Sequence, residues 1–541
     1  MIKRGVKLPG PSRVLYNFDP SHLSSIPPRV GGYAQPITRE YVESFAKEIA
    51  GRGVDAFFCC PSMLRRSLWM SKIDTHWEDE ALEIQEPPNP YEWEWDQKLY
   101  FRMRSYILSG GRPIHELYEA SRREGLSFFF SYRMNDCHYL EKSSSPLLDK
   151  FWREHPELRI GDYGGVHPNM HPQLANLLQN YMYPEIRQHY LQILEELLSS
   201  FDVDGLEMDF MRKPCLVPLP QVEEGREVMT GFVRDVRKML DRFGQARGKS
   251  LPLCVRVPHT VQSCYDLAMD VVRWDAEGLI QMVNVSTSFL TNMYALDIRG
   301  FRETLKSARV YAEMHYPVAY GKKWPNYGRR FLRGTTQRQY ETAAYYLMNR
   351  GADGVSLFNF VGTRQHEFND PRARTYPGAE PPLKALDHLD DRDYLETAPK
   401  HYFVNRMIVD GREYRVCAVP AQDDLVTNIE LFEKDIRGTY GDAVFRVETE
   451  DSSRHLPIAA YINGTRLEAF EGTGELFPPV SIEGLAPLEN LRYFRVPVDL
   501  LKTGSNVVEV HNEQKTHPKE FTTFVYLEIA LYPKGSSFGV A

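Results

Sequence analysis

Short apolar runs alternate with segments of helical periodicity through the first two thirds of the chain. In the segments between these runs, such as residues 184–201, apolar residues recur at the spacing of one helix face. Alternation of this kind is typical of βα units that build a parallel sheet. The runs expected to form strands are 13–18, 54–60, 126–132, 203–210, 251–257, 279–286, 309–314 and 354–360.

Eight such strands predict a (β/α)8 barrel over residues 1–367, longer than the usual ~250 residues because of long loops. A doubly wound open sheet is the alternative. Neither GxGxxG nor GxxxxGK[ST] follows the first strand, which disfavours a nucleotide-binding version of that sheet. The long insertion at 61–115 follows the second strand and is rich in aromatic and charged residues. We expect it to line a substrate site rather than to act as scaffold.

The pattern changes after residue 367. Residues 368–400 are rich in Pro and Asp and are expected to form a linker. From 401 to 541 apolar and polar residues alternate, and Asn463-Gly464 is a hairpin signal between two apolar runs. We therefore expect a C-terminal all-β sandwich, jelly-roll-like in character, after the barrel.

Composition removes several function classes. The 541 residues are too many for one ordinary domain. The net charge of −8 argues against a general nucleic-acid partner. No apolar run approaches the ~18 residues of a membrane helix, so no membrane partner is expected. Seven cysteines without a CxxC pair favour reduced thiols. The start has no apolar signal region, so we expect a cytoplasmic protein, or a secreted or periplasmic one if a signal segment precedes this sequence.

The stretch FDVDGLEMDFMRKP (201–214) places carboxylates inside an expected barrel strand. Because barrel residues alternate between the interior and the helix layer, the apolar Leu206 and Met208 predict that Glu207 and Asp209 point inward. Burying an unpaired carboxylate is costly. Asp209 is at the carboxyl end of the strand, where barrel enzymes hold their chemistry, so we expect a site there.

Polar residues also follow the other central strands. Glu313 ends the seventh strand, and a second carboxylate across the barrel mouth is what glycoside hydrolysis requires. Asp209 is the expected general acid/base and Glu313 the nucleophile or base. Glu207, deeper in the barrel, joins the catalytic set as a structural or pKa-tuning partner. The expected substrate-binding residues are Arg133, Asn135, His138, Arg212, Arg256, His259, Asn284 and His315.

Each of these assignments has a plainer alternative. Asp209 would be structural if it formed a salt bridge with Arg212 or Arg256. The histidines would be metal ligands in a metal-dependent hydrolase or lyase, although no HxH or HExxH spacing supports that. The basic residues in the binding set favour an anionic group on the substrate.

The segment NYMYPEIRQHYLQILEELLSSFDVDGLEMDFMRKP (180–214) resembles the region around strand 4 of the glycosyl hydrolase-like 10 family. Its DGxxxD core is also similar to the strand-4 motif of family 18 barrels, although Met211 stands where those enzymes carry their catalytic Glu. The resemblance implies a (β/α)8 glycosidase barrel with Asp209 as catalytic acid. The matching positions are Pro184, Glu185, Arg187, Asp204, Gly205 and Asp209.

The C-terminal phrase LLKTGSNVVEVHN is similar to jelly-roll modules appended to carbohydrate-active enzymes. No Trp lies after residue 324, so we expect a structural role for this part. Taken together, the sequence predicts a glycoside hydrolase that cleaves an oligosaccharide or polysaccharide fragment with two carboxylates and no cofactor or metal. The alternative of another class is a non-catalytic carbohydrate-binding protein on a degenerate barrel.

Overall fold

The computed structural model describes residues 13–26, 35–77, 94–165, 172–287, 290–323, 330–368, 380–405, 407–409, 412–414, 418–420, 424–449, 453–477, 490–513 and 521–539. The chain divides into two compact units. The first comprises residues 1–288, 296–313 and 351–368, and the second comprises 289–295, 314–350 and 369–541.

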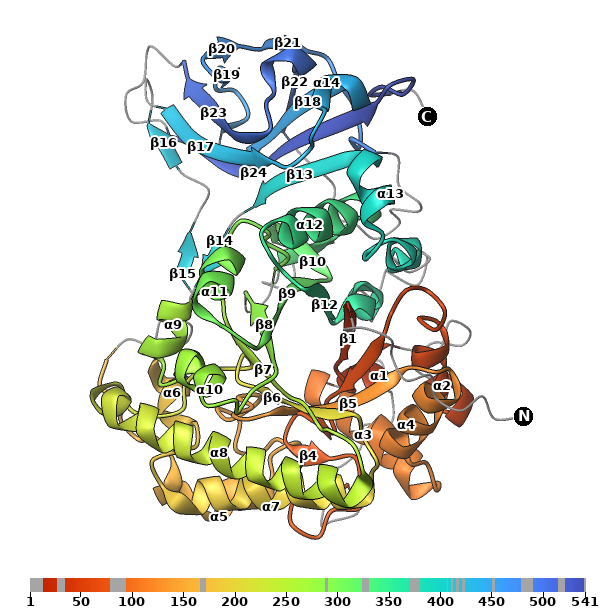
Figure 1. Cartoon of the computed structure of the whole chain (residues 1–541), viewed down its shortest axis with the longest axis vertical. Helices are drawn as coiled ribbons and strands as arrows, with labels where there is room; N and C mark the ends of the chain where they lie inside the picture. The colour runs from red at the N-terminus through yellow and green to blue at the C-terminus, as the bar shows by residue number, and fades with distance from the viewer. Residues whose placement is uncertain are drawn as a thin grey trace. The chain divides into compact units, whose positions relative to one another are not determined.

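Eight parallel strands close into a barrel in the order β1-β12-β9-β8-β7-β6-β5-β2 (Figure 1). This confirms the (β/α)8 prediction and excludes the open doubly wound sheet. The strands are β1 (Val14–Phe18), β2 (Ala56–Cys59), β5 (Ser127–Arg133), β6 (Gly205–Asp209), β7 (Leu253–Pro258), β8 (Met282–Ser286), β9 (Arg309–His315) and β12 (Gly354–Phe358). Every predicted strand is present, with ends that differ from the prediction by at most three residues.

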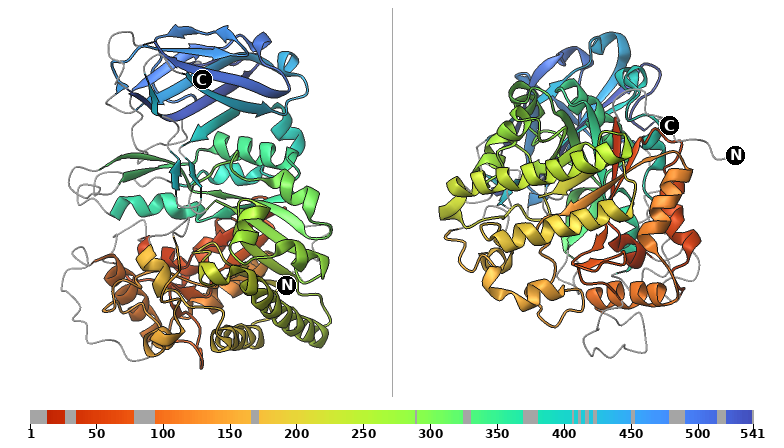
Figure 2. Two further views of the ribbon diagram at one scale, coloured as in Figure 1. Left: turned by 90° about the vertical axis from the view of Figure 1, so that its left-hand side faces the viewer. Right: turned by 60° about the horizontal axis from the view of Figure 1, so that its bottom comes forward.

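Helices surround the barrel. The two longest lie side by side, namely α7 (Pro184–Ser200) and α8 (Val222–Arg247) (Figure 2). Pro184 suits the first turn of α7, and Gly248 ends α8 in the left-handed conformation at φ 64°. The others in this unit are α1 (Ser21–Ser25), α2 (Arg39–Lys47), α3 (Trp95–Leu108), α4 (Pro113–Arg123), α5 (Lys150–Glu154), α6 (Pro172–Leu177), α9 (Val261–Asp266), α10 (Val271–Ala276) and α11 (Ile298–Thr304), with 3-10 turns at Pro156–Leu158, Leu219–Gln221 and Phe360–Phe368.

The barrel interior is apolar at one level and polar at the next. A buried cluster fills the lower level: Leu15, Ala56, Phe58, Phe129, Cys254, Met282 and Tyr311. Gly205 belongs to this level, because a Cβ on it would lie 2.1 Å from the Phe129 ring. Glu207 and Asp209 follow Gly205 with the same inward parity. Strand β6 therefore contributes Gly205 to the apolar level of the barrel interior and Glu207 and Asp209 to the polar level that follows.

The described part of the insertion at 61–115 contains regular secondary structure. It contains the short strands β3 (Ser62–Met63) and β4 (Arg66–Ser67) and the helix α3; residues 78–93 lie outside the described part. Glu196 of α7 fixes the first section, accepting hydrogen bonds from Trp69 Nε1 at 3.1 Å and Lys72 N at 2.7 Å. Hydrogen bonds to α7 therefore hold this section against the helix layer of the barrel.

The second unit carries the antiparallel sheets expected at the C-terminus. One sheet has the order β13-β24-β18-β22-β21, with β16 also on β24, and another has the order β17-β23-β19-β20. Asn463 and Gly464 adopt φ 51° and 79° between β19 and β20, as the hairpin signal predicts. Their strands are β13 (Lys400–Asn405), β16 (Ala418–Pro420), β17 (Asp424–Leu431), β18 (Tyr440–Thr449), β19 (Ile458–Ile462), β20 (Thr465–Arg466), β21 (Glu468–Phe470), β22 (Leu491–Arg495), β23 (Gly504–Asn512) and β24 (Phe521–Pro533).

Helix α12 (Gln337–Asn349) belongs to this second unit. The Thr342 hydroxyl accepts a hydrogen bond from the backbone N–H of His401 at 2.8 Å, and Gln339 Nε2 donates to the Tyr526 hydroxyl at 2.5 Å. The helix thus packs on strand β13. The unit also contains β10 (Pro317–Lys323), β11 (Arg330–Gly334), β14 (Met407–Val409), β15 (Arg412–Tyr414), α13 (Arg392–Thr397), α14 (Ile436–Thr439) and 3-10 turns at Leu383–Asp387 and Val498–Leu500.

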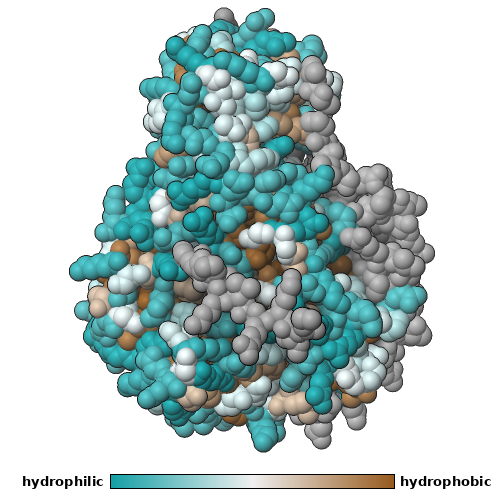
Figure 3. All heavy atoms as spheres, turned by 45° about the vertical axis from the view of Figure 1, so that its right-hand side comes forward, coloured by the Kyte–Doolittle hydropathy of each residue, from teal (hydrophilic) through white to brown (hydrophobic). Residues whose placement is uncertain are grey.

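The surface is mainly polar. In Figure 3 hydrophilic residues cover most of the visible face, and hydrophobic residues form small patches between them. No helix among the described residues is both long enough and apolar enough to cross a membrane.

Candidate active site

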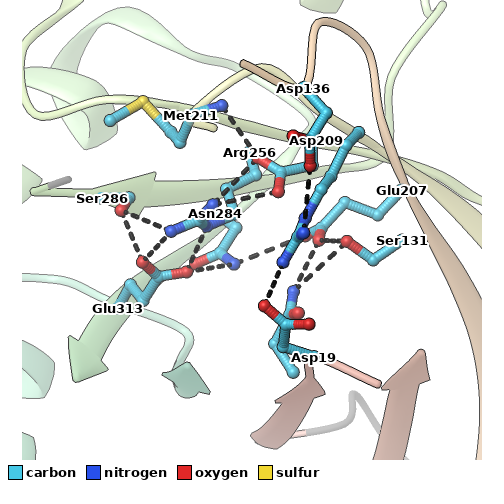
Figure 4. Close-up of polar contacts among 12 residues, drawn as sticks. Asp19, Ser131, Asp136, Glu207, Asp209, Met211, Arg256, Asn284, Ser286 and Glu313 are labelled. Carbon is cyan, nitrogen blue, oxygen red and sulfur yellow. Dashed lines mark hydrogen bonds and ion pairs between the residues drawn. The ribbon is translucent and has the colours of Figure 1, made fainter. Parts of the chain in front are cut away.

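Arg256 lies between the two predicted catalytic carboxylates (Figure 4). Its Nη1 donates to both Asp209 oxygens, at 2.9 and 3.0 Å. Its Nε and Nη2 donate to Glu313 Oε2 at 2.5 Å and Oε1 at 2.7 Å. Asp209 is 1 % exposed and Glu313 is fully buried. The salt bridge considered as an alternative for Asp209 is therefore present, and one guanidinium joins both acids.

The network around Glu313 favours its ionised form. Ser286 Oγ donates to Oε1 at 2.5 Å and Asn284 Nδ2 to Oε2 at 3.3 Å, in addition to the two bonds from Arg256. The Arg256 guanidinium also lies 3.9 Å from the centre of the Phe358 ring. Hydrogen bonds of this kind stabilise a carboxylate charge, and together they hold the Glu313 side chain in a fixed orientation.

Glu207 has a different environment from the other two acids. It accepts hydrogen bonds from Asn17 Nδ2 at 2.7 Å and Ser131 Oγ at 2.6 Å, and Cys254 Sγ lies 3.3 Å away. No ion pair reaches it among the described residues. Burial, followed by the charge of Asp209, raises the pKa of Glu207 from 4.5 to about 7. Near neutral pH both protonation states of this carboxyl group are therefore populated.

A second ion cluster lies at the ends of β1 and β5. Arg133 Nη2 donates to Asp19 Oδ2 at 2.5 Å, and Nη1 donates to Asp136 Oδ2 at 3.1 Å. Asp136 Oδ1 is 2.6 Å from His138 Nδ1. Burial by itself raises the pKa of Asp136, but His138 and Arg133 outweigh it and hold that pKa well below its ordinary value. Arg133 is therefore occupied by two carboxylates.

The loop after β6 carries Arg212 beside this cluster. Arg212 is half-buried, and its Nη2 contacts His138 Nε2. Met211, one position earlier, donates its backbone N–H to Asp209 Oδ1 at 2.8 Å. The loop therefore both orients the Asp209 carboxylate and carries a guanidinium toward the β5 loop.

The remaining predicted binding residues have other surroundings. Asn135 is buried, and its amide nitrogen donates to the carbonyls of Gln179 and Cys215, both at 2.9 Å. Its two N–H groups thus tie loop segments together. His259 directly follows β7, and its carbonyl accepts from Asp297 N at 3.0 Å. His315 ends β9 within the second unit, where its N–H donates to Thr291 Oγ1 at 2.7 Å.

Several residues that contact the predicted charged side chains were not among the predicted site residues, including Asn17, Asp19, Ser131 and Ser286. Each has the inward parity of its strand or follows it directly, and each contacts a charged side chain. A signal for the first pair was present in the sequence, because the phrase NFDP places polar residues at alternate positions at the end of an apolar run. Their partners lie on strands that are distant in the sequence, so the sequence alone could not identify them.

A small polar cavity lies beside Arg133 on the outer side of β5. It measures about 30 Å³, room for water-sized molecules rather than a sugar ring. Asp74 lines it, and burial together with the charge of Asp149 raises the pKa of Asp74 to about 8. Within the described ranges, no group of three or more His, Cys, Asp or Glu side chains is placed to hold a metal ion.

No protein-family model matches this sequence, and no curated protein matches it. Solved structures with some similarity include a glycoside hydrolase family 18 N-acetylglucosaminidase from Paenibacillus barengoltzii (11% identity, TM-score 0.37, 70% of this chain and 100% of that chain). A family 29 α-L-fucosidase from Bacteroides thetaiotaomicron has 11% identity and a TM-score of 0.34, covering 96% and 92%. A chitinase-like agglutinin from Robinia pseudoacacia has 9% identity and a TM-score of 0.37, covering 70% and 99%. Likenesses at this level do not decide family, substrate or mechanism, and the glycosyl hydrolase-like 10 resemblance stays a prediction.

Proposed function

We propose that this chain is a glycoside hydrolase whose chemistry takes place at the carboxyl ends of β6 and β9. The observation that carries the proposal is the convergence of Asp209 and Glu313 on one guanidinium, that of Arg256. Two carboxylates separated by no more than a guanidinium and two hydrogen bonds can act on one glycosidic bond. A purely structural barrel has no need of acids at this level, because an apolar layer would fill it at lower cost.

The surroundings of the two acids assign them different roles. Glu313, with four donors around it, stays ionised and is the nucleophile or the base that activates water. Asp209 is the acid/base, since it has fewer donors and is held by the loop that follows β6. Glu207 does not contact the reacting atoms in this scheme. It changes the local charge beside Asp209 as it gains or loses its own proton.

Substrate must alter the contacts of Arg256. Asp209 and Glu313 are too buried to touch a sugar in the described conformation. A sugar that enters the barrel mouth would take Arg256 away from Asp209, which frees this carboxyl group to take up a proton. The proposal therefore includes a rearrangement of one side chain on binding.

The same ion pairs favour a second candidate function. If Arg256 keeps both carboxylates in every state, the acids are structural and the protein is a carbohydrate-binding barrel without catalysis. A metal-dependent hydrolase or lyase ranks below both, because among the described residues no group of three or more His, Cys, Asp or Glu side chains, Glu207 and Asp209 included, is placed to hold a metal ion.

The test is product release from a panel of oligosaccharides, polysaccharides and aryl glycosides. Wild type is compared with Asp209→Asn and Glu313→Gln. Glu528→Gln is the matched control, because Glu528 is a fully buried acid paired with Arg446 at 2.5 Å in the second unit. All variants are first checked for folding by circular dichroism and thermal unfolding.

We expect wild type and Glu528→Gln to cleave the same substrate, and the two site variants to lose at least 1,000-fold in kcat, on the order of the effect of removing a group that acts in the transition state. Full activity in Glu313→Gln would exclude the assigned acid pair. Saturable glycan binding without cleavage by any of the four proteins would establish the binding-protein alternative.

A further inference from the structure

Arg212 differs from the other two arginines of the candidate site. Arg256 is engaged by Asp209 and Glu313, and Arg133 by Asp19 and Asp136. Among the described residues, no carboxylate lies within ion-pair distance of Arg212. Its Nη2 contacts His138, and its Nε is buried without an acceptor. A buried N–H group is normally paired, so this one requires an explanation.

The contact with His138 positions Arg212 without neutralising it. His138 Nδ1 lies 2.6 Å from Asp136 Oδ1, so the ring proton belongs on Nδ1 and Nε2 accepts from Arg212. Burial, and then the charge of Arg212, lowers the pKa of His138. A neutral imidazole fixes the direction of the guanidinium and leaves its charge in place.

The charges near Arg212 are predominantly positive. Lys213 follows it directly and is half-buried; burial lowers the Lys213 pKa, and Arg212 lowers it further. Asp136, a described acid whose charge interacts with that of Arg212, already accepts from Arg133 and His138. The loops after β5 and β6 therefore combine a directed guanidinium, an unpaired N–H group and adjacent positive charge.

We propose that Arg212 binds an anionic group of the substrate, a carboxylate or a sulfate ester carried on the saccharide. A planar guanidinium matches both groups geometrically, and the unpaired Nε–H is the donor that such a group would engage. Asp209 is the last residue of β6 and Arg212 is three residues further on, in the loop that follows, so the anionic group would be bound on the side of the site formed by this loop. This inference rests on the proposed function and adds the substrate class, an acidic or sulfated glycan.

A neutral sugar would serve this position less well. A hydroxyl group can accept from Nε, but it brings no charge to the Arg212–Lys213 pair. Selectivity for the anion therefore comes from charge, because a hydrogen bond from a guanidinium to an anionic oxygen is stronger than one to a neutral hydroxyl.

The experiment uses matched glycan pairs that differ only in charge. One pair is oligogalacturonides and their methyl esters, and the other is κ-carrageenan oligosaccharides and their desulfated forms. Binding is measured by calorimetry at constant ionic strength with the full chain, using wild type, Arg212→Gln and Arg212→Lys. Arg226→Gln is the control, since Arg226 is a half-buried arginine on α8, outside the candidate site, that stacks 3.9 Å from the Tyr265 ring. The two pairs separate a carboxylate ligand from a sulfate ligand.

We expect wild type and Arg226→Gln to bind one charged glycan at least tenfold more tightly than its neutral partner. Arg212→Gln should lose that preference and Arg212→Lys should recover part of it. Equal preference in wild type and Arg212→Gln, or no preference in wild type, would overturn the inference. Cleavage of a neutral glycan that is unaffected by Arg212→Gln would leave the hydrolase proposal standing and remove only the anionic substrate. Selective binding of the charged glycan without its cleavage would support the anion site at Arg212 and contradict the hydrolase proposal.

Discussion

Arg256 holds Glu313 through two parallel hydrogen bonds inside the barrel, with Nε–Oε2 at 2.5 Å and Nη2–Oε1 at 2.7 Å. The same guanidinium extends its Nη1 to Asp209. A single cation therefore compensates two buried anions that come from different strands. The stability of this level of the barrel depends on that one side chain.

Removing the cation should destabilise the barrel strongly. We expect Arg256→Met to lower the free energy of unfolding by about 3–5 kcal/mol, because it leaves two buried carboxylates without the guanidinium that compensates their charge. Urea denaturation at pH 7 measures the change. Arg234→Met is the matched control and should cost less than about 1 kcal/mol, since Arg234 pairs with Glu277 in a more exposed position. Adding Asp209→Asn and Glu313→Gln to Arg256→Met should restore part of the loss. A loss as small as that of the control would contradict the ion-pair account.

The proton on Glu207 should make stability fall as pH rises. The folded pKa of about 7 lies above the ordinary value of 4.5, so the folded state binds this proton more tightly than the unfolded state does. The free energy of unfolding should therefore decrease between pH 4.5 and 7 by about 3 kcal/mol from this group alone, and be level above pH 7.

Glu207→Gln isolates this contribution, because glutamine stays neutral throughout. The difference between wild type and Glu207→Gln should change across pH 4.5 to 7 and stay constant above it. Other groups, such as Asp74, titrate in both proteins and cancel in the difference. Chemical denaturation at several pH values provides the measurement. A difference that is independent of pH would mean that Glu207 is ionised throughout this range.

Gly205 should not tolerate a methyl group. The Cβ of an alanine there would lie 2.1 Å from Phe129 Cε1, so Gly205→Ala should cost about 1–3 kcal/mol through overpacking. The same change at Gly231 of α8 meets open space and should be neutral or stabilising by up to about 1 kcal/mol. Thermal unfolding of both variants, together with Gly205→Ala/Phe129→Leu, tests the contact. Rescue by the second substitution is expected; its absence would place the strain elsewhere.

Thr342→Val should weaken the second unit. Valine keeps the shape of threonine but leaves the buried N–H of His401 without an acceptor, at a cost of about 1–3 kcal/mol. Thr342→Ser retains the hydroxyl and should cost less. Hydrogen exchange at the His401 amide is the direct readout, and it should accelerate only in the valine variant. Equal exchange in both variants would argue that α12 does not hold β13.

The sequence by itself determined the architecture. Eight apolar runs with helical segments between them allow few arrangements other than a closed barrel, because each strand must bury both faces. The sequence also indicated which residues of β6 point into the barrel, since the apolar Leu206 and Met208 face the helices and Glu207 and Asp209 alternate with them. Local periodicity carries that information, and the Asn463-Gly464 turn is a further case in which two adjacent residues suffice.

Only the tertiary structure decided what the inward residues do to one another. Arg256 was predicted as a substrate contact, yet its strand register places it next to Asp209, and Glu313 reaches it from β9. Likewise, Asn17 meets Glu207 across 190 positions of sequence. Such partners depend on how eight strands close around a shared axis, and the energy of a buried charge depends on every neighbour within a few ångströms. A single sequence fixes which residues point inward; closure of the barrel determines which charges are paired and leaves Arg212 without a carboxylate partner among the described residues.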